Sequence, residues 1–149
     1  MSAFDTVSKV LKEWQPRQFP TELGYRDSLA ALLRDRLPKA KVETEYRHGG
    51  TTIDVYLKED GFFGSSEVFI ELKRNLSHKA QLDRLVGQME SLLPGKNAIV
   101  LVLCGDTNPA LVTRFKEKYK DHTGEDGWVI LGEPMAVVLK KDVGKTEKS

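Results

Sequence analysis

Hydrophobic residues are spaced at helical intervals in two segments near the N-terminus. In the first, residues 3–14, the apolar positions are Phe4, Val7, Leu11 and Trp14. This spacing predicts a short amphipathic helix. After a segment interrupted by two prolines, Thr21 is expected to cap a second helix that extends to about Leu37.

Three segments then alternate between apolar and polar residues, as half-buried strands do. They are residues 42–46, where Val42, Thr44 and Tyr46 alternate with glutamates, followed by residues 51–57 and 67–73. With a side-chain period of two, Ile53, Val55 and Leu57 should share one face of the second strand. Residues 48–50 predict a turn, and the turn-forming residues 58–66 predict a hairpin between the second and third strands.

The second half of the chain continues with helices and strands in turn. The expected elements are a helix from Ser77 to about Leu93, an apolar strand at Ala98–Cys104, a helix at residues 109–120, and short strands at residues 128–131 and 135–139. The unbroken apolar run at 98–104 is typical of a strand that is covered on both faces. Helix, three strands, helix and strand make a mixed α/β order.

Length and composition favour one compact, soluble domain. The chain has 149 residues, of which 40% are hydrophobic and 30% are charged. We expect an N-terminal helix and linker at residues 1–20, the main domain at residues 21–140 and a polar tail at residues 141–149. No apolar run is long enough to span a membrane. A single cysteine and the lack of a signal-peptide pattern predict a cytoplasmic location.

The most informative polar residues lie on the second and third predicted strands. Asp54 is an isolated acid on the second strand, and the third contains Glu71-Leu72-Lys73. Because side chains alternate, Glu71 and Lys73 should lie together on the face opposite Leu72. In a hairpin, one register brings Asp54 opposite or diagonal to Glu71, with the carboxylates about 5 Å apart.

Two carboxylates at that separation require a compensating positive charge. They repel by roughly 3 kcal/mol at an effective dielectric constant near 20. Lys73 offsets part of this repulsion, and a divalent ion would offset more of it. Hard carboxylate oxygens suit Mg²⁺, which can polarise a phosphoryl oxygen and activate a bound water. The alternative is that these charges simply form the solvated face of a sheet.

Asp54, followed by Glu71-Leu72-Lys73 on the next strand and then a helix that contains Gln88, resembles the PD-(D/E)xK nuclease superfamily. The resemblance covers about residues 21–104, and Ile53 stands where many members have proline. It implies a restriction-endonuclease-like αβββαβ core, a mixed sheet flanked by helices, here with an extra N-terminal helix.

The resemblance also implies roles for particular residues. Asp54 and Glu71 would bind Mg²⁺, with Mn²⁺ as a substitute, and Lys73 would orient or activate the attacking water. Glu22 is the candidate for a third acid, contributed by the first core helix, and Gln88 for a further catalytic residue. From the sequence alone, Glu22 could equally be an acid that favours a helix N-terminus, and Gln88 a boundary residue.

The net charge of +1 does not by itself indicate nucleic-acid binding, so local clusters of basic residues matter more. The candidate nucleic-acid contacts are Arg74, Lys79, Arg84 and His48. A second basic group comprises Arg34, Arg36, Lys39 and Lys41. Each basic cluster could also be a solvated helix face, and His48 a surface histidine.

Two functions follow from these residues. The first is a Mg²⁺-dependent nuclease that hydrolyses the phosphodiester bonds of nucleic acid, with DNA as the expected substrate. The second is a catalytically silent module of the same fold that binds nucleic acid or a protein. A homodimer would suit cleavage of two strands. The sequence does not distinguish DNA from RNA or endonuclease from exonuclease, and it does not indicate a pathway.

Overall fold

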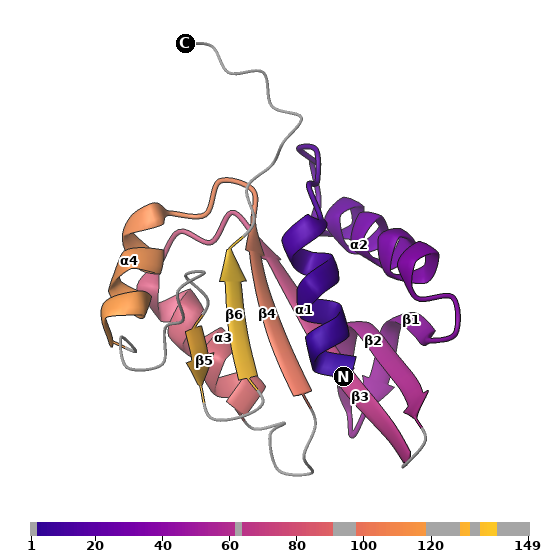
Figure 1. The fold of residues 1–149 in the computed structure, drawn as a ribbon. Helices are drawn as coiled ribbons and strands as arrows, with labels where there is room; N and C mark the ends of the chain where they lie inside the picture. Colours follow the sequence, from indigo (N-terminus) through magenta and orange to yellow (C-terminus); the bar gives the residue numbers. More distant parts are fainter. Residues whose placement is uncertain (1–2, 62–63, 91–97, 119–128, 132–134, 140–149) are drawn as a thin grey trace.

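The computed structural model describes residues 3–61, 64–90, 98–118, 129–131 and 135–139. It shows an α/β chain whose helices lie on both faces of one mixed sheet (Figure 1). In chain order the elements are α1 (Ala3–Glu13), α2 (Glu22–Arg36), β1 (Lys41–His48), β2 (Thr51–Gly61), β3 (Gly64–Arg74), α3 (Lys79–Glu90), β4 (Ala98–Cys104), α4 (Pro109–Lys118), β5 (Val129–Leu131) and β6 (Met135–Leu139). The predicted order of helices and strands is therefore confirmed for the described residues.

The sheet joins an antiparallel half to a parallel half. Its strand order is β1-β2-β3-β4-β6-β5. The pairs β1–β2, β2–β3 and β5–β6 are antiparallel, whereas β3–β4 and β4–β6 are parallel. Strand β3 is thus the boundary, with the β1–β2 hairpin on one side and the parallel strands on the other.

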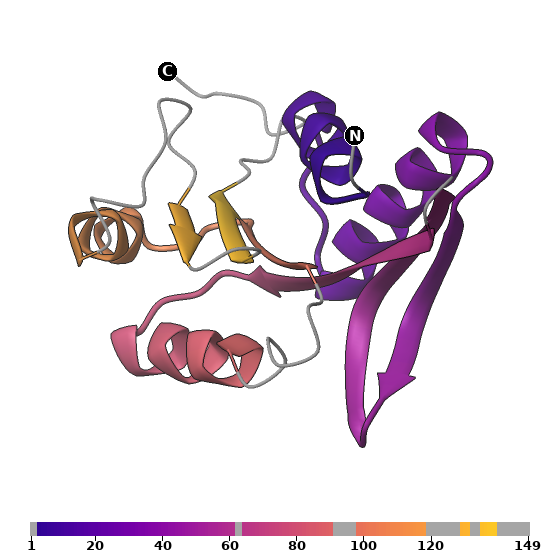
Figure 2. The ribbon, with the colours of Figure 1, turned by 60° about the horizontal axis from the view of Figure 1, so that its bottom comes forward.

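Two hydrophobic clusters, one on each face of the sheet, hold the layers together. The first packs α1 and α2 against β2, β3 and β4, through residues such as Leu11, Tyr25 and Ile70. The second packs α3 and α4 against the other face, through residues such as Phe69 and Leu85. Figure 2 shows α1 and α2 on one side of the sheet and α3 on the other. All seven residues of β4 are buried, as expected for a strand covered on both faces.

Helix α1 packs on its own chain. Val7, Leu11 and Trp14 belong to the first cluster, and Trp14 Nε1 donates a hydrogen bond to Ser28 Oγ of α2 at 3.2 Å. The apolar face that the sequence predicts for this helix is therefore buried against α2 and the sheet. Thr21 caps α2 as predicted, because its hydroxyl accepts the Gly24 N–H.

The β2–β3 hairpin is longer than the sequence predicts. The expectation of a turn over residues 58–66 was wrong in extent, because β2 continues to Gly61 and β3 begins at Gly64. Residues at this end are charged and are paired across the strands, as in Lys58↔Glu67. Opposite charges across a strand pair favour pairing and tolerate solvent on both faces.

The predicted alternation fails at one point in the β1–β2 hairpin. Ile53 does not share a face with Val55 and Leu57: it lies in the second cluster, whereas they lie in the first. Likewise Val42 packs against the first cluster and Tyr46 against the second. Between these residues lies Glu45, whose backbone is left-handed with φ 52°. A left-handed residue reverses the direction in which the following side chains point, so the faces exchange there.

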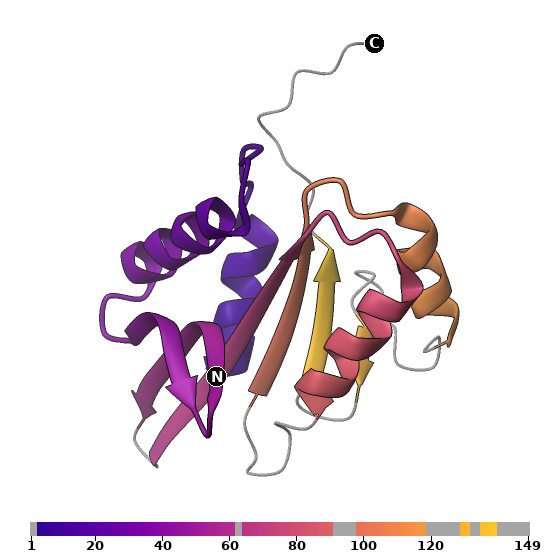
Figure 3. The same ribbon diagram turned by 180° about the vertical axis from the view of Figure 1, so that it is seen from behind.

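Helix α3 begins later than predicted. The expected cap, Ser77, lies two residues before the first helical residue, Lys79. The side-chain oxygen of Gln81 instead accepts the backbone N–H groups of Ser77 and His78, which satisfies donors at this helix start. Seen from behind, α3 lies over the β4–β6 side of the sheet (Figure 3).

Several predicted segments lie outside the described residues. They are the end of the α3 helix at 91–93, residues 119–120 of the fourth helix, Trp128 and the tail at 141–149. Among the residues that are described, no helix has the length and apolar character needed to cross a membrane.

Candidate active site

The side chains of Asp54 and Glu71 each accept a backbone N–H from the facing strand, so that a crossed pair of hydrogen bonds links β2 and β3. The Asp54 N–H donates to Glu71 Oε1 at 2.9 Å, and the Leu72 N–H donates to Asp54 Oδ2 at 2.9 Å. Backbone pairing of these strands runs from Gly61↔Gly64 to Val55↔Ile70, so the two acids follow directly after its last pair. Each carboxylate therefore accepts an N–H from the opposite strand where the pairing ends. The predicted proximity of Asp54 and Glu71 is present in the structure.

The surroundings of the two acids favour their protonated forms. Burial, together with the charge of Asp54, raises the pKa of Glu71 to about 8, although the Asp54 N–H and Lys73 act in the opposite direction. Burial also raises the pKa of Asp54, against the effects of the Leu72 N–H, Lys73 and Arg26. Two carboxyl groups in one partly buried place thus lack enough positive charge to be fully ionised at neutral pH.

Glu22 and Lys73 bring α2 and β3 together beside these acids. Lys73 Nζ lies 3.7 Å from Glu22 Oε1, and the side chains are 45% and 42% exposed. Burial raises the pKa of Glu22, Lys73 opposes that change, and the charge of Asp54 reinforces it. Glu22 therefore lies within electrostatic range of Asp54, and its role as a third acid stays a prediction. Because both partners are half exposed, this ion pair can open without a large cost.

Arg26 and Glu45 also meet beside this site, and no motif in the sequence marks either of them. Arg26 Nη1 donates to Glu45 Oε1 at 2.9 Å, and Arg26 Nη2 lies 2.9 Å from Asp27 Oδ1. Arg26 is close enough to Asp54 to lower its pKa. The one signal in the sequence is spacing, since Arg26 follows Glu22 by four residues and so shares its face of α2.

The predicted nucleic-acid contacts are dispersed over several elements. Arg74, next to Lys73, donates from Nε to the carbonyl of Phe19 at 3.0 Å. Lys79 pairs with Asp83 within α3. Arg84 and His48 are exposed, and His48 rests edge-on against the Phe69 ring with centroids 4.8 Å apart.

Gln88 is exposed on α3. The structure describes its backbone within the helix, and its catalytic role stays a prediction. The second basic group is engaged locally: Arg34 donates to the Val42 carbonyl, Arg36 to Glu13, and Lys41 pairs with Glu43. These contacts tie three of its four members to neighbouring residues.

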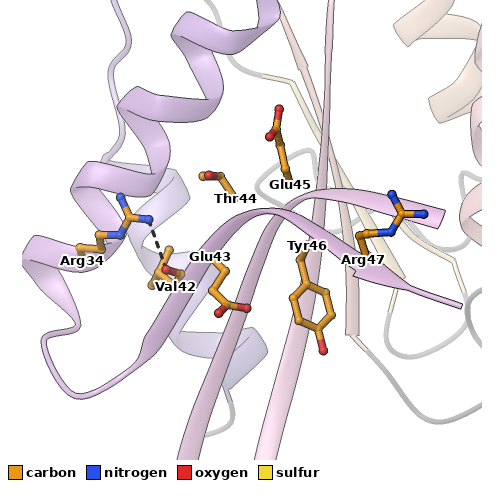
Figure 4. Close-up of a pocket in the computed structure, with 7 residues that line it drawn as sticks. All are labelled: Arg34, Val42, Glu43, Thr44, Glu45, Tyr46 and Arg47. Atoms are coloured by element: carbon orange, nitrogen blue, oxygen red, sulfur yellow. Dashed lines mark hydrogen bonds between the residues drawn. The ribbon is translucent and has the colours of Figure 1, made fainter. Parts of the chain in front are cut away.

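A shallow hollow lies beside edge strand β1. It is lined by Arg34 and residues 42–47 (Figure 4). Asp54, Glu71 and Lys73 are not among its lining residues. In the described part of the chain, no three or more His, Cys, Asp or Glu side chains are grouped closely enough to hold a metal ion. The candidate site is thus a pair of acids with Glu22 and Lys73 beside it.

Comparison with known proteins yields no match to a protein-family model, to a curated protein or to a solved structure. The interpretation of this site therefore depends on its own residues and their geometry.

Replacing Asp54 tests whether its carboxylate is strained or supports the fold. Asp54→Asn should leave the metal-free protein as stable as wild type or slightly more so, since the amide oxygen can still accept the Leu72 N–H and one charge is removed. Asp54→Ala should cost about 1–3 kcal/mol, because the N–H of the buried Leu72 loses its acceptor. Urea unfolding at pH 7 with a chelator measures both. A loss for Asn as large as that for Ala would show that the charge itself is stabilising.

Glu71 should make the metal-free protein less stable as the pH rises. In the unfolded chain Glu71 loses its proton near its ordinary pKa of 4.5, whereas in the folded chain it keeps the proton up to a pKa of about 8. Between these values the folded state binds more protons, so the free energy of unfolding falls with pH, by at most about 1.4 kcal/mol per pH unit. Glu71→Gln should flatten this dependence between pH 5 and 8. Equal slopes for the two proteins would contradict the prediction.

Proposed function

We propose that this protein is a metal-dependent nuclease of the PD-(D/E)xK type, which hydrolyses phosphodiester bonds of DNA or RNA. The observation that carries the proposal is the meeting of the Asp54 and Glu71 carboxylates where β2 and β3 cease to pair. The order α2-β1-β2-β3-α3-β4 also agrees with the αβββαβ core of the restriction-endonuclease-like fold.

The donor set suits Mg²⁺. The hydrogen bonds described above engage one oxygen of each carboxylate, Asp54 Oδ2 and Glu71 Oε1, on backbone N–H groups. These bonds orient both side chains, and a carboxylate oxygen can accept more than one partner. Burial raises the pKa of both acids and the charge of Asp54 adds to the shift of Glu71, and a divalent cation bound between them would oppose both effects. Asp54 and Glu71 would hold the ion, with Glu22 as a third acid.

When bound, Mg²⁺ supplies a Lewis acid that lowers the pKa of a water and polarises a phosphoryl oxygen. The chain supplies the groups around it. Lys73, half exposed and next to Glu71 on β3, can place its ammonium against a phosphate oxygen or the attacking water. Glu22 holds Lys73 in this position and can release it when a phosphate competes for the ammonium. Arg74, anchored on the Phe19 carbonyl, adds a second positive charge at the same strand end.

The second candidate is a module of the same fold that binds nucleic acid or a protein without cutting. One observation favours it: no three acids in the described part of the chain are grouped to hold a metal. Whether Asp54 and Glu71 bind a metal ion therefore distinguishes the nuclease from the binding module.

We expect Mg²⁺ or Mn²⁺ to bind through Asp54 and Glu71. Calorimetric titration of wild type should show binding that is weakened at least about tenfold in Asp54→Asn, because that variant lacks one of two charged ligands. Lys9→Ala, which changes an exposed residue of α1, is the control. Equal affinity in wild type and Asp54→Asn would place any metal elsewhere.

Loss of Lys73 should reduce the rate of cleavage more than binding. Its ammonium acts chiefly as negative charge develops in the transition state, so Lys73→Ala should lower the cleavage rate at least ~100-fold with Mg²⁺ while most nucleic-acid affinity at fixed salt is retained. Single-stranded, duplex and branched DNA and RNA are the substrates, with Lys9→Ala again as control. Wild type that binds one of them and cuts none would establish the binding module instead.

A further inference from the structure

Glu45 adopts a backbone conformation that its residue type does not favour. Its φ is 52°, and among the described non-glycine residues only Asn75 shares a positive value. The left-handed region crowds Cβ against the following carbonyl oxygen, and asparagine tolerates this better than glutamate does. Nothing in the local sequence of β1 accounts for the conformation of Glu45. Glu45 does, however, make a contact with a distant part of the fold.

Arg26 of α2 provides that contact. Its Nη1 donates to Glu45 Oε1 at 2.9 Å, and its other side meets Asp27 Oδ1. The Arg26 side chain is only 14% exposed, whereas that of Glu45 is 67% exposed. Most of the Arg26 side chain is therefore covered, its guanidinium binds two carboxylates, and α2 is held against the sheet by Tyr25 and Leu29. Glu45 is thus attached to a rigid anchor.

Glu45 lies directly opposite Asp54 in the β1–β2 hairpin. Pairing of β1 and β2 runs from Lys41↔Lys58 to His48↔Thr51 in one register, and it skips only the position where Glu45 faces Asp54. Because the register is the same on both sides, no residue is inserted. Figure 4 shows Thr44 and Glu45 on one side of β1 and Glu43 and Tyr46 on the other. The hairpin thus twists at Glu45 and Asp54.

The twist leaves Asp54 outside the regular pairing of β2 with both neighbouring strands. Its carboxylate is then able to turn toward β3, where Oδ2 accepts the Leu72 N–H. A regular strand would place Asp54 on the face shared by Tyr56, and Ile53 on the face of Val55. The structure instead places Ile53 in the cluster that contains Tyr56. The orientation of Asp54 is thus coupled to the backbone of Glu45.

We propose that Glu45, held left-handed by Arg26, is a positioning residue that turns the Asp54 carboxylate toward β3. It acts through the backbone of the β1–β2 hairpin and does not itself touch the reacting groups. The expected effect of Glu45 on metal binding rests on the proposed function. Its expected effect on the hydrogen bond from the Leu72 N–H to Asp54 is independent of that function.

Two substitutions at Glu45 separate its backbone conformation from its charge. Glu45→Asn and Glu45→Val both remove the carboxylate that Arg26 binds. Asparagine adopts positive φ readily, whereas β-branched valine strongly disfavours it. If Glu45 were only a surface ion-pair partner, the two variants would behave alike. Glu45→Thr is a second β-branched variant, which keeps the test informative if Glu45→Val does not fold.

Hydrogen exchange of the Leu72 amide in the metal-free protein is the first measurement. Glu45→Val should speed this exchange about tenfold, the effect of losing one hydrogen bond, while Glu45→Asn stays close to wild type. The second is Mn²⁺ affinity by calorimetry, which should fall about 10–100-fold in Glu45→Val, the range for residues that orient metal ligands, and little in Glu45→Asn.

Equal effects of Asn and Val, or unchanged Leu72 exchange in both β-branched variants, would overturn the proposal. Failure of the proposed function looks different, since wild type would then bind no metal and cut no nucleic acid. Leu72 exchange would still decide the positioning role in that case.

Arg26 is tested in the same assays. Arg26→Met should speed Leu72 exchange and weaken Mn²⁺ binding, as Glu45→Val does, because Glu45 then loses the partner that holds its left-handed backbone. Arg47→Met, at an exposed position two residues further along β1, is the control and should leave Leu72 exchange unchanged. Equal exchange rates in wild type and Arg26→Met would remove Arg26 from the proposal.

Discussion

The crossed hydrogen bonds between Asp54 and Glu71 and the backbones of the facing strands are the interaction on which this site depends. Where β2 and β3 stop pairing, the backbone N–H groups of Asp54 and Leu72 take side-chain oxygens as acceptors. A buried N–H without an acceptor is costly, so the two carboxylates are needed structurally as well as chemically. This dual use keeps two acidic groups close together in a partly buried place that disfavours the ionisation of both. It also fixes which oxygen of each carboxylate faces the backbone.

The charge balance around the acids comes from two different layers of the fold. Lys73 lies on the same strand as Glu71, whereas Glu22 and Arg26 come from α2, one helical turn apart. Helix α2 is positioned by its own buried residues and by the Trp14–Ser28 hydrogen bond to α1. The N-terminal helix therefore contributes to the site indirectly, through the placement of α2. A change in the packing of α1 should therefore move Glu22 relative to Lys73.

The site also occupies a characteristic place in the sheet. Glu71, Lys73 and Arg74 lie toward the carboxyl end of β3, which is parallel to β4 and antiparallel to β2. Ligands of open α/β sheets commonly bind outside the carboxyl ends of the strands. Here β2 and β3 cease to pair near that end, and polar side chains take the place of a regular strand pair. The boundary between the two halves of the sheet therefore creates room for the acid pair.

Alternation and turn chemistry in the sequence were sufficient to predict the hairpin and the nearness of Asp54 to Glu71. They also predicted the cap that sets Glu22 at the start of α2. Each of these features follows from contacts that are local in sequence or from a short hairpin. Alternation and turn chemistry could not predict the exchange of faces at Glu45, the burial of Ile53 in the second cluster or the role of Arg26. A glutamate carries no local signal for a left-handed backbone. Its conformation is set by an arginine 19 residues away in the chain, and only the packing of α2 against β1 brings the two together.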